Sequence, residues 1–184
     1  MSQAFFPRLC ALALAMGVSL AAGAADPAAE IVSLEGKGEA REAQQTAWSA
    51  AKVKQRLFPT NFVRTLDLSR MGVLLVDGTQ VRLAPNSQLQ IKEAAKGHDA
   101  KTILNLNAGR SWVQSKVAPR GLVMETPSAV AAIRGTDWEM AVDGEGRATL
   151  SVLSGEVEFS NALGAVVVQR GEQALAEKGK APVK

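Results

Sequence analysis

From about residue 62 onward, apolar and polar side chains alternate along the chain with a period of two, in short runs separated by turn residues. Within residues 80–83 the apolar positions are Val81 and Leu83, and residues 148–152 show the same alternation. This period places one face of a strand against a core and the other toward solvent. Runs of four to seven residues with turns every eight to twelve predict an all-β domain, stacked as a sandwich, barrel or solenoid. Because no long helical period interrupts these runs, a parallel α/β sheet is excluded.

The alternation also predicts which side chains fill the core. Trp112 and Trp138 are expected on the core face, because aromatic side chains contribute large buried areas. The other inward positions are Leu83, Leu104, Leu106, Met124, Ile133, Met140, Leu150, Val152 and Phe159.

Turn residues divide the runs. Asp77-Gly78 is a strong signal for a two-residue hairpin. Gly135-Thr136 is the sharpest local motif: Gly135 would supply an unusual backbone angle at a corner and Thr136 would bond to the turn, with a backbone nest or partner-contact loop as the functional alternative. The remaining turn positions are Gly109, Pro127, Gly155 and Gly171, and the glycines recur at roughly 16 to 26 residues, which favours stacked β-coils.

The two flanks of this pattern are less regular. In residues 26–61 a strand is predicted near Ile31, and it ends at Gly36. Residues 39–57 are rich in good helix formers, but their apolar spacing is poor for a packed helix, so their structure stays open. Residues 176–184 are expected to form a flexible tail.

Residues 1–25 have the features of a secretory signal peptide: a single charge at Arg8, an apolar run over 9–22 and small residues up to Ala25. The run is shorter than the roughly 20 residues that span a bilayer, so no transmembrane segment is expected in the mature chain. Cys10, the only cysteine, lies at the front of the apolar run instead of behind it, which is the wrong place for a lipid anchor. We therefore expect a periplasmic or secreted protein of about 159 residues, without disulfides.

Composition narrows the function classes. Without Arg8, 20 of the 21 Lys and Arg residues remain against 18 Asp and Glu, and these charges are interspersed. Nucleic-acid binding, which needs a concentrated basic face with aromatics, is not expected. The single histidine, His98, lies in a polar stretch, and Asp137 and Glu139 share a face expected to be solvated. No catalytic, cofactor-binding or metal site is predicted, and the chain is not expected to be an enzyme.

Five segments of the chain, in order, carry a resemblance to a known family. They read LLVDGTQVRLAPNSQLQI (74–91), LNLNAGRSWVQS (104–115), METPSAVAAIRGTDWEMAV (124–142), LSVLSGEVEF (150–159) and VVVQRGEQA (166–174). Together they resemble the FecR domain over about residues 62–175. The resemblance implies a single all-β FecR-like domain that serves protein–protein signalling at the cell envelope. In the sigma-regulator branch a cytoplasmic anti-sigma segment and a transmembrane helix precede this domain. Here the predicted signal peptide stands in their place, so the chain looks more like the secreted branch.

Two functions follow as expectations. The first is a non-catalytic interaction or scaffold module that binds an envelope protein, and the alternative is a peptidoglycan or polysaccharide binder that uses an exposed aromatic. An open all-β module ends in edge strands, whose unpaired N–H and C=O groups can accept an incoming strand. The candidate edge lies in the last strands of the pattern, at Val157, Phe159, Val166 and Val168.

Overall fold

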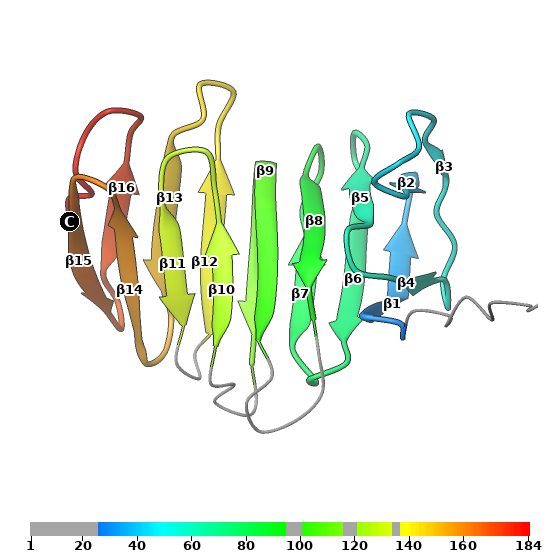
Figure 1. Cartoon of the computed structure of the whole chain (residues 1–184), viewed down its shortest axis with the longest axis horizontal. Coiled ribbons are helices and arrows are strands. Elements are labelled where there is room, and N and C mark those ends of the chain that lie inside the picture. Colours follow the sequence, from blue (N-terminus) through cyan, green and yellow to red (C-terminus); the bar gives the residue numbers. More distant parts are fainter. Residues whose placement is uncertain (1–25, 95–100, 116–120, 134–136) are drawn as a thin grey trace, which may run out of the picture.

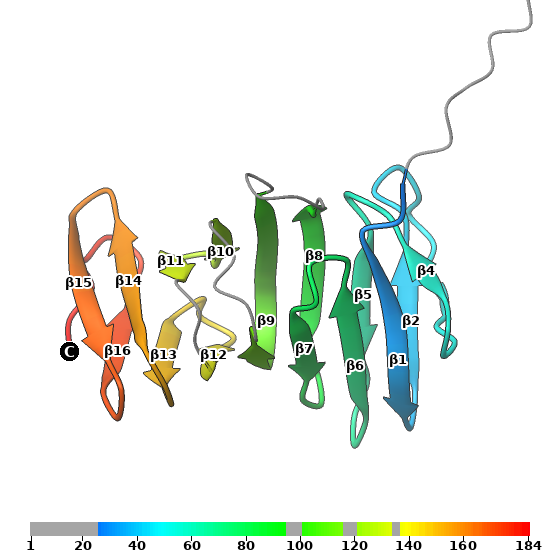
Figure 2. The ribbon, with the colours of Figure 1, turned by 90° about the horizontal axis from the view of Figure 1, so that it is seen from below.

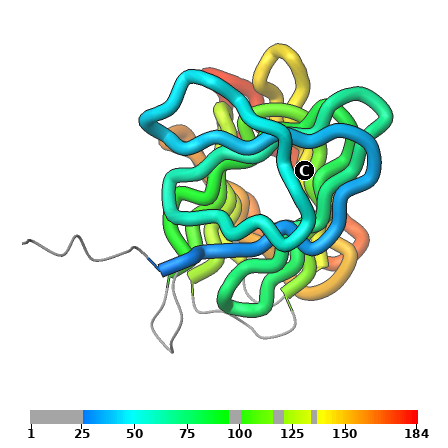
Figure 3. The backbone as a smooth tube through the Cα atoms, turned by 90° about the vertical axis from the view of Figure 1, so that its right-hand side faces the viewer, coloured from blue at the N-terminus to red at the C-terminus, as the bar shows by residue number. Residues whose placement is uncertain are grey.

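The structure is a computed structural model of the chain, and it describes residues 26–94, 101–115, 121–133 and 137–184. Sixteen strands and no helix occur in these residues, which confirms the predicted all-β fold. The strands form one open, hydrogen-bonded sheet that is folded into two layers, and they stand side by side along the long axis of the molecule (Figure 1). Seen along this axis, the backbone winds in stacked coils (Figure 3).

The first layer reads, in spatial order, β4 (Arg56–Leu57), β1 (Ala29–Glu35), β6 (Arg70–Leu75), β7 (Gln80–Leu83), the C-terminal half of β9 (Thr102–Gln114), β12 (Asp137–Val142), β13 (Ala148–Val152) and β16 (Gln173–Ala176). The second reads β3 (Ser49–Ala50), β2 (Gly38–Arg41), β5 (Phe62–Thr65), β8 (Gln88–Glu93), the N-terminal half of β9, β10 (Leu122–Glu125), β11 (Val130–Ile133), β14 (Glu156–Asn161) and β15 (Gly164–Gln169). Neighbouring strands are antiparallel except for β9 and β10. Figure 2 shows β10 and β11 separated from β12 and β13 of the other layer.

The core lies between the two layers and runs the length of the molecule as one cluster of buried apolar side chains. Ten of the predicted core residues are each at most 2% exposed: Leu83, Leu104, Leu106, Met124, Ile133, Trp138, Met140, Leu150, Val152 and Phe159. The period-two prediction is confirmed at all ten.

The prediction for Trp112 is wrong, and the cause is a change of phase within β9. Leu104 and Leu106 point inward, but beyond Gly109 the inward positions are Ser111 and Val113. Gly109 has a φ of +85°, and a Cβ there would lie 2.4 Å from the Cα of Ser87. Only glycine fits this close crossing, where β9 passes from one layer to the other. The resulting shift turns Trp112 to the outer face, where it is half-buried.

The open question over residues 39–57 is answered by strands and loops, with no helix. In β2, Gly38 and Ala40 are buried while Glu39 and Arg41 point outward, and β5 pairs along the whole strand. Pairing with β5 outweighs the helix propensity of the segment. Residues before 62 also supply Ile31 and Leu57 to the shared core.

The expectation of a flexible tail over residues 176–184 is corrected by the contacts of the C-terminus. Val183 exchanges two backbone hydrogen bonds with Leu175 of β16, at 2.8 and 2.9 Å. Pro182 is buried, and the side-chain amide of Asn161 donates to the carbonyl of Lys180 at 2.7 Å. Residues 180–183 therefore return along β16.

Candidate interaction edge

Four strands end the two layers, and they are the places where another chain could pair. β3 and β4 lie at the N-terminal end of the long axis, and β15 and β16 lie at the opposite end, beside the C-terminus (Figure 1). An edge strand presents unpaired backbone groups unless something covers or shortens it. Whether each of the four strands is free to pair therefore depends on its backbone partners.

The candidate edge named from the sequence divides into an interior strand and an edge. β14, which carries Val157 and Phe159, pairs with β11 on one side and β15 on the other, and both side chains are fully buried. Placing these two residues at the edge was wrong, because the chain turns once more after β14. β15, which carries Val166 and Val168, pairs with β14 alone.

Register identifies which backbone groups of β15 are free. Asn161 and Gly164 close a two-residue hairpin loop, so by antiparallel alternation the residues bonded to β14 are Gly164, Val166 and Val168. The N–H and C=O groups of Ala165 and Val167 point away from β14. Neither residue has another backbone partner within the part of the chain that the structure describes.

Gln169 closes one end of this edge. Its N–H donates to the Glu172 carboxylate at 2.8 Å, and its C=O accepts from the Glu172 N–H at 2.9 Å. The free stretch is therefore short and centred on Val167.

The side chains of β15 do nothing to discourage pairing. The strand contains neither proline nor a charged residue, although charge and proline are common protections of edge strands. Val167 is 47% exposed and Ala165 is exposed, whereas Val168 is fully buried against the core. The nearest charge on the outer face is Glu158, which lies opposite Val167 on β14.

The neighbouring edge, β16, is covered by the chain's own C-terminus. Besides the Leu175–Val183 bridge, the Lys184 ammonium pairs with the Glu172 carboxylate at 2.6 Å. This contact, together with the hydrogen bond from the Gln169 N–H, lowers the pKa of Glu172. A partner strand would have to displace these residues to reach β16.

The N-terminal edges are short and flanked by charge. β3 and β4 have two residues each, and Lys52, Lys54 and Arg56 are exposed around them. Two guanidinium groups lie close to the ring of Trp48, next to β3: Arg64 is 4.2 Å and Arg41 5.0 Å from its ring centroid.

The same stack continues away from β3. Arg41 also lies 4.2 Å from the Phe62 ring centroid, and the Nε of Arg64 donates to Glu39 at 2.6 Å. The stack fixes the segment between β2 and β3 to the outer face of β5.

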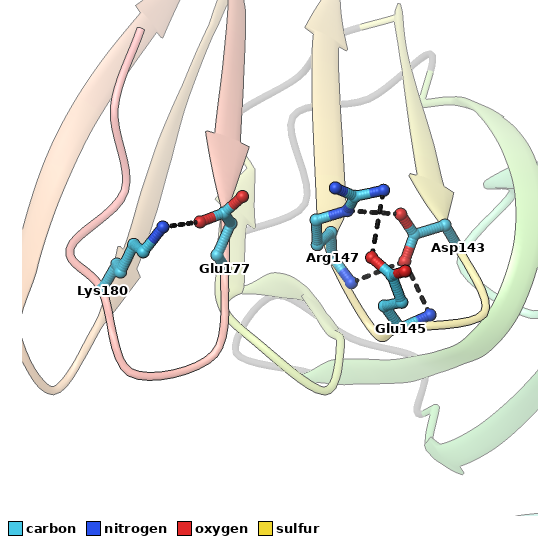
Figure 4. Close-up of polar contacts among 5 residues, drawn as sticks. All are labelled: Asp143, Glu145, Arg147, Glu177 and Lys180. Atoms are coloured by element: carbon cyan, nitrogen blue, oxygen red, sulfur yellow. Dashed lines mark hydrogen bonds and ion pairs between the residues drawn. The ribbon is translucent and has the colours of Figure 1, made fainter.

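The acidic turn between β12 and β13 is structural. Asp143 accepts hydrogen bonds from the backbone N–H groups of Glu145 and Arg147 and pairs with the Arg147 side chain at 2.6 Å (Figure 4). These bonds lower the pKa of Asp143. Nearby, the Lys180 side chain bonds to Glu177 and lowers the pKa of that carboxyl. The carboxylates are thus held by cations of the same chain.

The other polar residues weighed from the sequence are also engaged in structure. Asp137 accepts from the side-chain amide of Gln114 at 3.2 Å, and Glu139 pairs with Arg110 at 3.3 Å. Within the described residues no three His, Cys, Asp or Glu side chains are grouped to hold a metal ion. His98 lies outside the described residues.

The turn residues named from the sequence mainly shape the turns and take part in the hydrogen bonds that close them. Asp77 accepts from the Thr79 N–H at 2.8 Å in the β6–β7 hairpin, and its other carboxylate oxygen accepts from the Thr102 hydroxyl. Pro127 lies in the β10–β11 connection, which the bond from the Thr126 N–H to the Ala129 C=O closes. Positive φ angles occur at Gly78, Gly109, Gly155 and Gly171. Gly135 and Thr136 lie outside the described residues, as do residues 1–25 with Cys10.

Trp112 lies on the outer face of β9. The Arg82 guanidinium on β7 lies 4.6 Å from its ring centroid, and Glu139 stands opposite it on β12. The outward position of Trp112 was missed because the pattern marks Gly109 only as a turn residue and does not show that the inward face of β9 changes there.

An elongated, two-layered β fold with an uncovered edge at β15 is the class that these observations define. The FecR protein family matches residues 61–158, more than half of the 184 residues, and the chain belongs to this family. Two crystal structures of a candidate anti-sigma factor from Parabacteroides distasonis share the fold, each with a TM-score of 0.58 at 17% sequence identity. The likeness covers 66% of this chain and 57% of the neighbour's. No curated protein matches the chain. In the described residues no helix is long and apolar enough to cross a membrane.

Proposed function

We propose that this protein is a non-catalytic interaction module of the cell envelope, which binds a protein partner by adding a strand to β15. The observation that carries the proposal is the pair of free residues at this edge, Ala165 and Val167, beside three edges that are short or covered. Strand addition needs such backbone groups, and it takes its specificity from the side chains beside them.

Family and fold support a regulatory role. The chain is a FecR protein, and its structural neighbour is described as an anti-sigma factor, a description that points toward protein partners. The features of residues 1–25 support export to the periplasm or beyond. N-terminal sequencing of the protein from a periplasmic extract tests this, with a mature start at Ala25 or Asp26 expected and an uncleaved Met1 contradicting it.

A matched pair of proline variants tests the edge itself. Val167→Pro removes an N–H that points away from β14, whereas Val166→Pro removes one that bonds to β14. We expect Val167→Pro to retain its fold and lose the partner in co-purification from native envelopes. Val166→Pro should destabilise the protein by about 1–3 kcal/mol, the cost of leaving a buried group unpaired.

Two outcomes would overturn the proposal. Unchanged partner capture by folded Val167→Pro would remove β15 from the interface. Collapse of Val167→Pro in a thermal melt, with Val166→Pro unaffected, would show that the register of the edge is inverted.

Trp112 supports a second candidate, binding of peptidoglycan or another polysaccharide. Its half-buried ring lies on the outer face among polar neighbours, but Arg82 stacks on it, and a sugar would need the ring face. A polysaccharide pulldown with wild type and Trp112→Ala tests this function. Loss of binding on substitution supports it, and absence of binding by the wild type rejects it.

A further inference from the structure

The C-terminal residues lie along a strand edge that they cover only in part. β16 pairs with β13 on one side, from Gln173 to Ala176. On its other side Leu175 exchanges two backbone hydrogen bonds with Val183. Outward backbone groups alternate along an antiparallel strand, so the N–H and C=O of Gln173 also point away from β13. Neither group has a backbone partner in the described residues, and half of this edge is therefore free.

The tail itself shows which side chains this edge accepts. Val183 lies opposite Leu175, and the Lys184 ammonium pairs with the Glu172 carboxylate at 2.6 Å. Pro182, which precedes them, is buried. A segment that occupies the same edge is therefore expected to carry a β-branched residue opposite Leu175, with proline before it and lysine or arginine after it.

Few interactions hold the tail on β16. The bridge to Leu175 is a single residue pair, and the Val183 side chain is 55% exposed. The side chains of Lys184 and Glu172 are 43% and 39% exposed, and exposed ion pairs contribute little to stability. A longer antiparallel segment would place its next residue opposite Gln173 and form two further backbone hydrogen bonds there. Such a segment can therefore compete with the tail.

Displacement would be confined to the last four residues. Lys180 is held in place, because its side chain bonds to Glu177 (Figure 4) and its carbonyl accepts from the Asn161 amide at 2.7 Å. Neither of these contacts involves β16's free edge. Residues 181–184 can therefore leave the edge while the turn before them stays closed.

We infer that β16 is a second strand-binding site, which residues 181–184 close in the free protein and which an extended segment of a protein partner opens by displacing them. The segment runs antiparallel to β16, and it carries a β-branched residue opposite Leu175 and a basic residue directed at Glu172. This site is separate from the β15 edge, so the inference goes beyond the proposed function and does not depend on it.

A fluorescent synthetic peptide, Lys-Ala-Pro-Val-Lys-Thr-Val, tests the inference. It repeats residues 180–184 and adds Thr-Val, which places the threonine opposite Gln173. Val183→Pro removes the N–H that donates to Leu175 and should open the edge. Because the peptide must displace the tail of the wild type before it binds, anisotropy titrations should show at least about tenfold tighter binding to Val183→Pro. Saturating peptide should also remove the protection of the Val183 amide in the wild type, but not that of Val113 in β9.

Val167→Pro, which changes the β15 edge, is the matched control and should bind the peptide as the wild type does. If a thermal melt shows that Val183→Pro is unfolded, Lys184→Ala takes its place, because it removes only the ion pair with Glu172, and it should bind the peptide several-fold tighter than the wild type. Equal binding by wild type and opened variant, binding by neither, or a Val183 amide that stays protected at saturating peptide overturns the inference. Loss of the envelope partner on Val167→Pro would still support the proposed function in each of these cases.

Discussion

The two ends of this protein differ in how their edge strands are protected from pairing with another chain. At the N-terminal end the last strands, β3 and β4, have two residues each, with exposed lysine and arginine side chains around them. At the C-terminal end β16 is covered by the returning tail, but the six-residue β15 beside it carries an exposed valine and no charge. A chain that protects three of four edges is able to protect the fourth. This difference supports the proposal that β15 is a binding surface.

Both ends of the molecule share one core, so substitutions in this core should have the largest effect on stability. Leu83 lies in β7 toward the N-terminal end and Leu150 in β13 toward the other, and both are at most 1% exposed. Replacing either by alanine should lower the free energy of unfolding by about 2–5 kcal/mol. Urea melts should show one transition in both variants, whereas the outward Ser151→Ala should change stability by less than about 0.5 kcal/mol.

Two separate transitions, or a loss confined to one variant, would mean that the ends are independent units. A clear loss for Ser151→Ala without one for Leu150→Ala would show that the faces of β13 are inverted.

Removing the Trp48 ring from the stack at the N-terminal end should have an intermediate effect on stability. Trp48→Ala removes two ring–guanidinium contacts, with Arg41 and Arg64, each worth about 0.5–1 kcal/mol at exposed sites. We expect a loss of about 1–2 kcal/mol in a urea melt and faster amide exchange at β3. Trp112→Ala, which loses one such contact, is the matched control and should cost about half as much.

Partner binding through β15 should be unaffected by Trp48→Ala. A variant that keeps its fold but loses partner binding would place the functional surface at the wrong end of the molecule.

The covering of β16 should be sensitive to acid, and this is the smallest effect. The Lys184 ammonium and the Gln169 N–H lower the pKa of Glu172 below its ordinary value of 4.5. A carboxyl with a lowered pKa in the folded state stabilises that state above the ordinary pKa, and the contribution is lost as the pH falls through the folded value. The protection factor of the Val183 amide, which bonds to Leu175, should therefore decrease below about pH 4.5. An amide inside β9, such as that of Val113, serves as the control.

Lys184→Ala should reduce the same protection at neutral pH. Protection of Val183 that is independent of both pH and Lys184 would show that the backbone bridge and buried Pro182 hold the tail without the ion pair.

The sequence was sufficient for the strand pattern and the core, because a period of two reports burial directly at positions such as Leu104 and Leu150. It failed where one residue changes the phase: Gly109 reverses the faces of β9, so Trp112 could not be placed without the crossing over Ser87. It also failed where long-range pairing decides, as for β2 against β5 and for the tail against β16. The candidate edge was located to within one strand, since only the fold shows that β15 lies outside β14.

Amide hydrogen exchange along β15 tests the central claim most directly. In dilute protein, the Val166 and Val168 amides should be protected by their bonds to β14, and the Ala165 and Val167 amides should exchange close to the rate of an unstructured chain. Slow exchange at all four positions in dilute protein, or protection of Ala165 and Val167 with free exchange at Val166 and Val168, would contradict the account.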